Sequence, residues 1–105
     1  MVIEHAELTI TPGREAAFEE AFTRGHRAIA KAPGYQWARL VRQVEKPSTY
    51  LLLVGWETVE AHTVDFRESA LFPQWRGAVA EYFAAPPGVT HYENPWETGL
   101  PIDLQ

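Results

Sequence analysis

Residues 50–56 form an unbroken apolar stretch, Tyr50-Leu51-Leu52-Leu53-Val54-Gly55-Trp56. An apolar run of this length that follows a turn-like segment containing Pro47 and Ser48 predicts a β-strand. A strand with one face in water alternates apolar and polar residues, and this stretch does not alternate. We therefore expect both faces of this strand to be covered in the working protein.

The segments around this strand predict one α+β domain with the element order β-α-β-β-α-β and an antiparallel sheet. Thr11 and Pro12 have the character of an N-cap and a first helical residue, and Thr58 that of a second N-cap. Pro73 predicts a break within the second helical region. The expected strands are residues 2–10, 35–45, 50–56 and 89–93, and the expected helical regions are residues 14–32 and 58–83.

The second and third strands are expected to form a hairpin. Simple alternation along residues 35–45 places Tyr35, Trp37 and Arg39 on one face. An arginine on an apolar strand face needs a partner, which would be either a carboxylate across a dimer or an anionic ligand.

The number of helices leads to a prediction about assembly. In this element order both right-handed crossovers place their helices on the same face of the sheet. The other face of residues 50–56 then needs a different cover, and a second copy of the chain in a two-fold interface would supply it. The alternative is a strand that leaves some leucines exposed. We expect a homodimer.

Composition excludes several classes of partner and site. The chain has 105 residues, a formal net charge of −5 and no cysteine. Excess negative charge argues against nucleic acid and anionic membranes as partners, and the missing thiols exclude disulfides and thiolate metal sites. The four histidines show no metal-ligand spacing, so no metal or other cofactor is expected. The N-terminus does not resemble a secretion signal, and a cytoplasmic location is the expectation.

The chain is expected to divide into a domain over residues 1–93 and an extended arm over residues 94–105. Pro95 and Pro101 disfavour regular structure in the arm, and Trp96 is expected to anchor it on the partner subunit.

Aromatic residues are frequent in the expected hairpin and helices. Together they would wall an apolar pocket between the helices and the sheet, which suits a planar aromatic ligand. The alternative is an ordinary aromatic core. The candidate substrate-binding residues, with Arg39, are Phe22, Tyr35, Trp37, Trp56, Phe66, Phe72 and Trp75.

Histidine is the side chain best suited to act as a base near neutral pH. His62 is the first candidate, because it lies one helical turn before Phe66 on the helix expected to line the pocket. The alternative is a polar residue on the exposed side of that helix. His5, on the first strand, is the second candidate, although its face depends on the strand register. His91 is expected to pack in an interface, and His26 to be solvated.

Three segments resemble the antibiotic biosynthesis monooxygenase family. They are Trp56-Glu57-Thr58 at a helix start, Asp65-Phe66-Arg67-Glu68-Ser69-Ala70-Leu71-Phe72, and Pro86-Pro87-Gly88-Val89-Thr90-His91-Tyr92. The opening strand that ends in Thr9-Ile10-Thr11-Pro12-Gly13 is similar too. The resemblance spans about residues 2–93 and implies a ferredoxin-like protomer in a dimeric α+β barrel.

The resemblance also implies a range of activities. Haem-degrading members use an Asn, a Trp and a His, and the matching positions hold Ala6, Phe66 and, close by, Arg76, so haem breakdown is disfavoured. Cofactor-independent monooxygenases use an Asn and a Trp one turn apart, which match His62 and Phe66. Related cyclases use a His on the first strand, near His5.

Three functions therefore compete. The first is a cofactor-independent monooxygenase acting on a planar phenolic or quinol-type small molecule. The second is a polyketide-type cyclase or isomerase on the same scaffold, which would not consume oxygen. The third is a non-catalytic dimer that binds a hydrophobic aromatic small molecule, because a fold does not determine a function.

Overall fold

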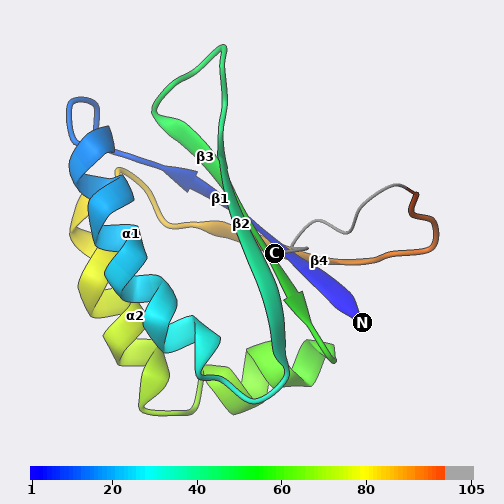
Figure 1. Cartoon of the computed structure of the whole chain (residues 1–105). Helices are drawn as coiled ribbons and strands as arrows, with labels where there is room; N and C mark the ends of the chain where they lie inside the picture. Colours follow the sequence, from blue (N-terminus) through cyan, green and yellow to red (C-terminus); the bar gives the residue numbers. More distant parts are fainter. Residues whose placement is uncertain (99–105) are drawn as a thin grey trace.

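The computed structural model describes residues 1–98 and confirms the predicted element order (Figure 1). The four strands form one antiparallel sheet in the order β2-β3-β1-β4, which is the ferredoxin-like arrangement. The strands are β1 (Val2–Thr9), β2 (Tyr35–Arg42), β3 (Thr49–Trp56) and β4 (Gly88–Glu93). The helices are α1 (Glu15–Ala30), the π-helix η1 (Ala61–Phe66), α2 (Leu71–Val79) and the 3₁₀ turn η2 (Ala80–Tyr82).

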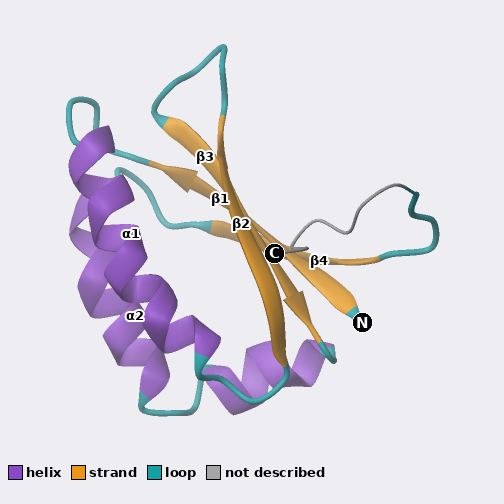
Figure 2. Cartoon of the chain, in the orientation of Figure 1, coloured by secondary structure: helices purple, strands orange, loops and turns teal. Residues whose placement is uncertain are grey.

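Helices α1 and α2 pack side by side on one face of the sheet, as Figure 2 shows. Tyr50, Leu52 and Val54 of β3 point into the core between the sheet and these helices and are almost fully buried. Leu51 and Leu53 alternate with them and are only half-buried. Within the described residues 1–98, no helix covers this second face, which we call the open face.

A bulge in β2 changes which residues share a face. The register of β2 against β3 shifts between Tyr35 and Trp37. Tyr35 consequently packs against the core, whereas Trp37 lies across Gly55 on the open face. The prediction that Tyr35 and Trp37 share a face is therefore wrong, because the extra residue of a bulge reverses the alternation.

Gly55 provides a test of this packing. A Cβ atom at Gly55 would clash with Nε1 of Trp37, so the indole would have to move. We expect Gly55→Ala to lower the free energy of unfolding by about 1–3 kcal/mol, as overpacking does. Urea denaturation measures the change. The matched control is Gly77→Ala in α2, where a Cβ meets nothing within 4 Å. That variant should be stabilised by about 0.5–1 kcal/mol. Equal effects at the two positions would contradict the packing of Trp37 on Gly55.

The start of α1 differs from the prediction. Gly13 has a φ of 90°, and the N–H of Arg14 donates to the Thr11 carbonyl at 2.9 Å. Pro12 and Gly13 therefore occupy the two central positions of a tight turn, and α1 begins at Glu15. The assignment of Thr11 as N-cap and Pro12 as first helical residue is wrong, because the glycine allows the chain to reverse first.

The other boundaries are close to those expected. Strand β2 ends at Arg42 instead of residue 45. The Thr58 hydroxyl accepts the N–H of Ala61 at 3.0 Å, which confirms the predicted cap. The break in the second helical region lies at residues 67–70, and Pro73 is accommodated in the first turn of α2, where no N–H partner is needed.

The C-terminal arm is described only in part. Residues 94–98 have no regular structure, and Trp96 is 77% exposed. The rest of the expected arm, residues 99–105, lies outside the described residues. No helix in the described part of the chain is long and apolar enough to span a bilayer.

Candidate functional site

A cavity of about 270 Å³ lies between the sheet and helix α2. Most of its wall is apolar and comes from β1, β3, β4 and α2. Three charged side chains, Glu4, Arg67 and Arg76, interrupt this wall. We call it the Glu4 cavity. Its remaining lining residues are Ala6, Leu8, Leu52, Phe72, Trp75, Phe83, Pro86, Pro87 and Val89.

Glu4 is a carboxyl group buried in a largely apolar core. Strand β1 turns Glu4 toward the helices together with Ala6 and Leu8, and Glu4 is only 7% exposed. The indole N–H of Trp56 donates to Oε1 of Glu4 at 3.0 Å. Burial raises the pKa of Glu4 to about 7, although the Trp56 hydrogen bond and the positive charge of Arg67 both oppose the rise. The carboxyl group is therefore able to change its protonation near neutral pH.

The π-helix η1 brings His62 against Glu4. π-helical turns widen a helix locally and occur often at functional sites. The His62 ring stacks on Trp56 at a centroid distance of 5.2 Å, and its Nε2 lies 3.3 Å from Oε1 of Glu4. Its Nδ1 forms a hydrogen bond of 2.8 Å with Nε2 of His91 on β4. Burial lowers the pKa of His62 to about 4, and the charges of Arg67 and His91 add to this effect.

Two arginines give the Glu4 cavity a positive edge. Arg67 follows η1, and Arg76 lies on α2 with its guanidinium carbon 6.0 Å from the centre of the Phe72 ring. Both side chains are exposed at the surface. A cation beside an apolar cavity stabilises an anionic oxygen of a bound ligand.

The structure brings several of the sequence-predicted residues together. Trp56, His62 and Phe66 form one buried aromatic cluster next to Glu4, with Trp56 and Phe66 ring centres 5.6 Å apart. Phe72 and Trp75 line the Glu4 cavity. A pocket therefore lies between the helices and the sheet, and Phe72 and Trp75 are the predicted residues that line it.

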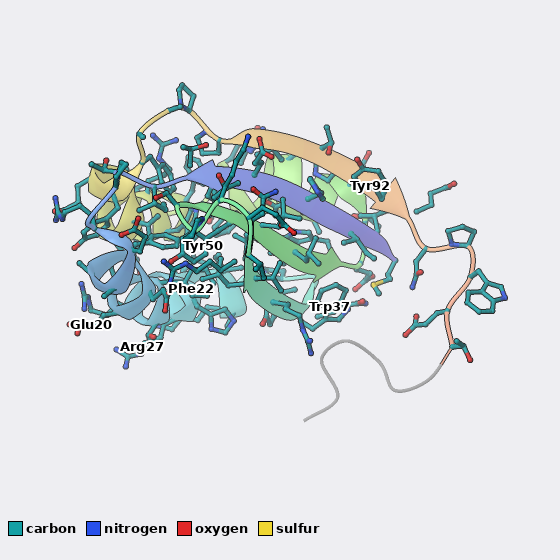
Figure 3. The ribbon with its side chains drawn as sticks, turned by 90° about the horizontal axis from the view of Figure 1, so that it is seen from above. Glu20, Phe22, Arg27, Trp37, Tyr50 and Tyr92 are labelled. Atoms are coloured by element: carbon teal, nitrogen blue, oxygen red, sulfur yellow. The ribbon has the colours of Figure 1, made fainter. Side chains whose placement is uncertain are left out.

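Other predicted residues lie elsewhere. Tyr35 forms a hydrogen bond with His26 of α1, and Phe22 stacks on the same histidine. Neither Tyr35 nor Phe22 lines the Glu4 cavity. Figure 3 shows Phe22 by α1 and Trp37 away from it on β2. Trp37 and Arg39 lie on the open face. Trp37 and Arg39 share one face of β2, as predicted, but that face lies on the opposite side of the sheet from the core aromatics.

His5 also lies on the open face. It is opposite Leu53 in the sheet, and its ring packs edge-on against Tyr92 at 5.5 Å. It therefore lies on the opposite side of the sheet from Glu4 and His62. The strand pattern of the sequence alone does not fix this register.

Sequence reasoning missed Glu4. Its signal was the spacing of β1, in which Val2, Glu4, Ala6 and Leu8 share the inward-facing alternate positions. A carboxylate at such a position is rare unless it has a partner or a function. Within residues 1–98, no three His, Asp or Glu side chains are arranged as metal ligands.

Comparisons with known proteins agree with this architecture. The antibiotic biosynthesis monooxygenase family matches residues 1–81. An uncharacterized protein of Bacillus subtilis, YczJ, is 37% identical over 94 residues, which cover 90% of this chain and 99% of YczJ.

Solved structures are similar as well. A protein of Bordetella bronchiseptica, named a putative antibiotic biosynthesis monooxygenase, superposes with a TM-score of 0.88 at 42% identity, covering 90% of this chain and 97% of that one. SnoaB, a cofactor-independent oxygenase of Streptomyces nogalater, superposes with a TM-score of 0.75 at 20% identity, covering 91% and 94% of the two chains. At that identity the likeness to SnoaB shows the fold alone. From the family match over most of the chain, with the fold that accompanies it, we conclude that this protein belongs to the antibiotic biosynthesis monooxygenase family.

Proposed function

We propose that this protein is a cofactor-independent monooxygenase that oxidises a phenolic or quinol-type aromatic molecule in the Glu4 cavity. The observation that carries the proposal is a buried carboxyl group, that of Glu4, in an aromatic cavity with arginines at its edge. A phenol reacts with oxygen far more readily once it has lost its proton. A site that removes this proton and holds the resulting anion would need no metal or organic cofactor.

Glu4 is the proposed base. Both Trp56 and His62 approach Oε1 of Glu4, and we assign its second oxygen, Oε2, to the substrate hydroxyl. His62 is less suited to take the proton itself, because both of its ring nitrogens already face protein partners and burial lowers its pKa to about 4. His62 would act by holding Glu4 in place.

The proposed reaction balances without another reagent. Glu4 removes the phenol proton, and the phenolate gives one electron to O₂; the radical pair then combines at a ring carbon. Glu4 returns the proton to the peroxide. Loss of the ring C–H proton to Glu4 and of hydroxide from the peroxide leaves a quinone, and the hydroxide leaves as water when it takes the proton from Glu4. In sum, one phenol and one O₂ become one quinone and one water.

The arginines and aromatic rings would position the substrate. Phe72 and Trp75 line the cavity with aromatic rings that a planar molecule could contact, and Arg67 and Arg76 would place positive charge near the developing phenolate.

We expect metal-free protein to consume oxygen with at least one member of a panel of phenols and hydroquinones, measured with an oxygen electrode.

kcat/KM should rise as pH increases through about 7, because the base must be deprotonated and burial raises the pKa of Glu4 to about 7. Product formed without oxygen would instead indicate a cyclase or isomerase. Tryptophan quenching by the panel with no product would indicate a binding protein.

We also propose that the working form is a homodimer closed across the open face. Leu51, Leu53 and Val41 give this face apolar area that the helices of the same chain do not reach. A second copy of the chain would cover the open face, and the sheets of the two copies would together form a barrel.

A further inference from the structure

Glu4, His62 and His91 contact one another in sequence between the Glu4 cavity and the surface. Glu4 lines the cavity, His62 is 4% exposed, and His91 on β4 is only half-buried. The gaps between them are 3.3 Å from Glu4 Oε1 to His62 Nε2 and 2.8 Å from His62 Nδ1 to His91 Nε2. Each imidazole thus offers one nitrogen to the preceding group and the other to the next group or to water.

We propose that Glu4, His62 and His91 form a proton wire that connects the cavity carboxyl group to solvent at Nδ1 of His91. This inference rests on the proposed function, in which Glu4 must lose its own proton to solvent before it can accept the proton of the bound phenol. A ligand that fills the cavity separates the buried Glu4 from water on that side. The wire gives the Glu4 proton a second route to solvent, through His62 and then His91 on β4.

Proton transfer along the wire requires one proton to move across each of its contacts. When Glu4 is protonated, its O–H donates to Nε2 of His62, and Nδ1–H of His62 donates to Nε2 of His91. Loss of the Nδ1 proton of His91 to water allows each hydrogen-bonded proton to move one place outward. Glu4 is then a carboxylate, and both histidines carry their proton on Nε2. One proton has left, and each histidine is neutral before and after.

The surrounding charges favour this kind of transfer. Glu4 from β1, His91 from β4 and Arg67, which follows η1, are the titratable or charged groups acting on His62. Burial lowers the pKa of both histidines, and the positive charge of Arg67 lowers it further, so both effects oppose a positive charge on either ring. Trp56 of β3 carries no charge. It fixes Oε1 of Glu4 by its N–H and holds the His62 ring by stacking at an interplanar angle of 14°.

The test is ¹⁵N NMR of the imidazole nitrogens, which distinguishes N–H from bare nitrogen, in ligand-free protein between pH 5 and 9. We expect His62 and His91 to change together from the Nδ1–H to the Nε2–H form as Glu4 loses its proton. Glu4→Gln should abolish this change at both residues. His26→Gln, which alters a histidine bonded to Tyr35 instead, should leave it intact. A His62 tautomer that stays constant across this pH range, or that switches equally in Glu4→Gln, overturns the wire.

Turnover provides the second arm. His91→Phe should lower kcat with little change in KM, and added imidazole should restore part of the rate. Unchanged kcat in a correctly folded His91→Phe protein overturns the wire while the oxygenase function stands. A coupled tautomer change in a protein that oxidises no member of the panel overturns the oxygenase function while the wire stands.

Discussion

Replacement of Glu4 by glutamine is expected to reduce turnover by about 10²–10⁴-fold, the range typical of a lost general base. Glutamine has nearly the same shape and keeps an oxygen that can accept the Trp56 N–H, but it cannot take a proton. The fold should therefore survive, whereas deprotonation of the substrate should fail. Oxygen uptake measures the rate, and the near-ultraviolet circular dichroism of the tryptophans reports on the fold.

The matched control for Glu4→Gln is Glu60→Gln. Glu60 is an exposed carboxylate at the start of η1, two residues from His62. Its loss changes the net charge by the same amount without touching the cavity, so activity should stay near that of the parent protein. Full activity in Glu4→Gln would remove Glu4 from the mechanism. Equal losses in both variants would mean that only overall charge matters.

The second large effect is expected on the open face. Leu53→Glu should convert the proposed homodimer to a monomer at micromolar concentration. Burial of a leucine contributes about 1.5–3 kcal/mol, and a two-fold interface contains the residue twice. The dimer should thus weaken by about 3–6 kcal/mol, or roughly 10²–10⁴-fold in its dissociation constant. Size-exclusion chromatography with light scattering measures the mass directly.

The protomer itself should tolerate this change. Residue 53 is directly opposite Arg39 on β2, so the new carboxylate has a cation across the strands. Val44→Glu is the control, because Val44 is 87% exposed in the β2–β3 turn. That variant should remain a dimer. A parent protein that runs as a monomer, or a Leu53→Glu protein that stays dimeric, would contradict closure across the open face.

Much of the architecture could be predicted because its signals are local. The non-alternating run at residues 50–56 and the helix-capping Thr58 each reflect short-range sterics or hydrogen bonding. These patterns indicated the element order and hence the face that carries both helices. The errors were local as well: Gly13 reverses the chain before α1, and a single extra residue in β2 separates Tyr35 from Trp37.

The candidate site could be predicted only in part. His62 was recognised as a candidate because histidine titrates near neutral pH and lay one turn from Phe66. Its low pKa and its contacts with Glu4 and His91 depend on residues 29 and 58 positions away in the chain, and no short pattern encodes them. Glu4 was missed, because the register of β1 against β3 and β4 is what shows that this side chain faces the core.

The amino-acid sequence by itself determined the α+β class and the order of the elements, and it left open whether the aromatic residues form a cavity or an ordinary core. Periodicity and turn chemistry act over a few residues and leave visible patterns. Only the tertiary structure decided that Glu4, not a histidine, is the group in the wall of the Glu4 cavity that can change its protonation near neutral pH. The physical reason is that burial changes a pKa through the summed desolvation by several distant elements, which meet only when β1, β3, β4 and η1 are packed together.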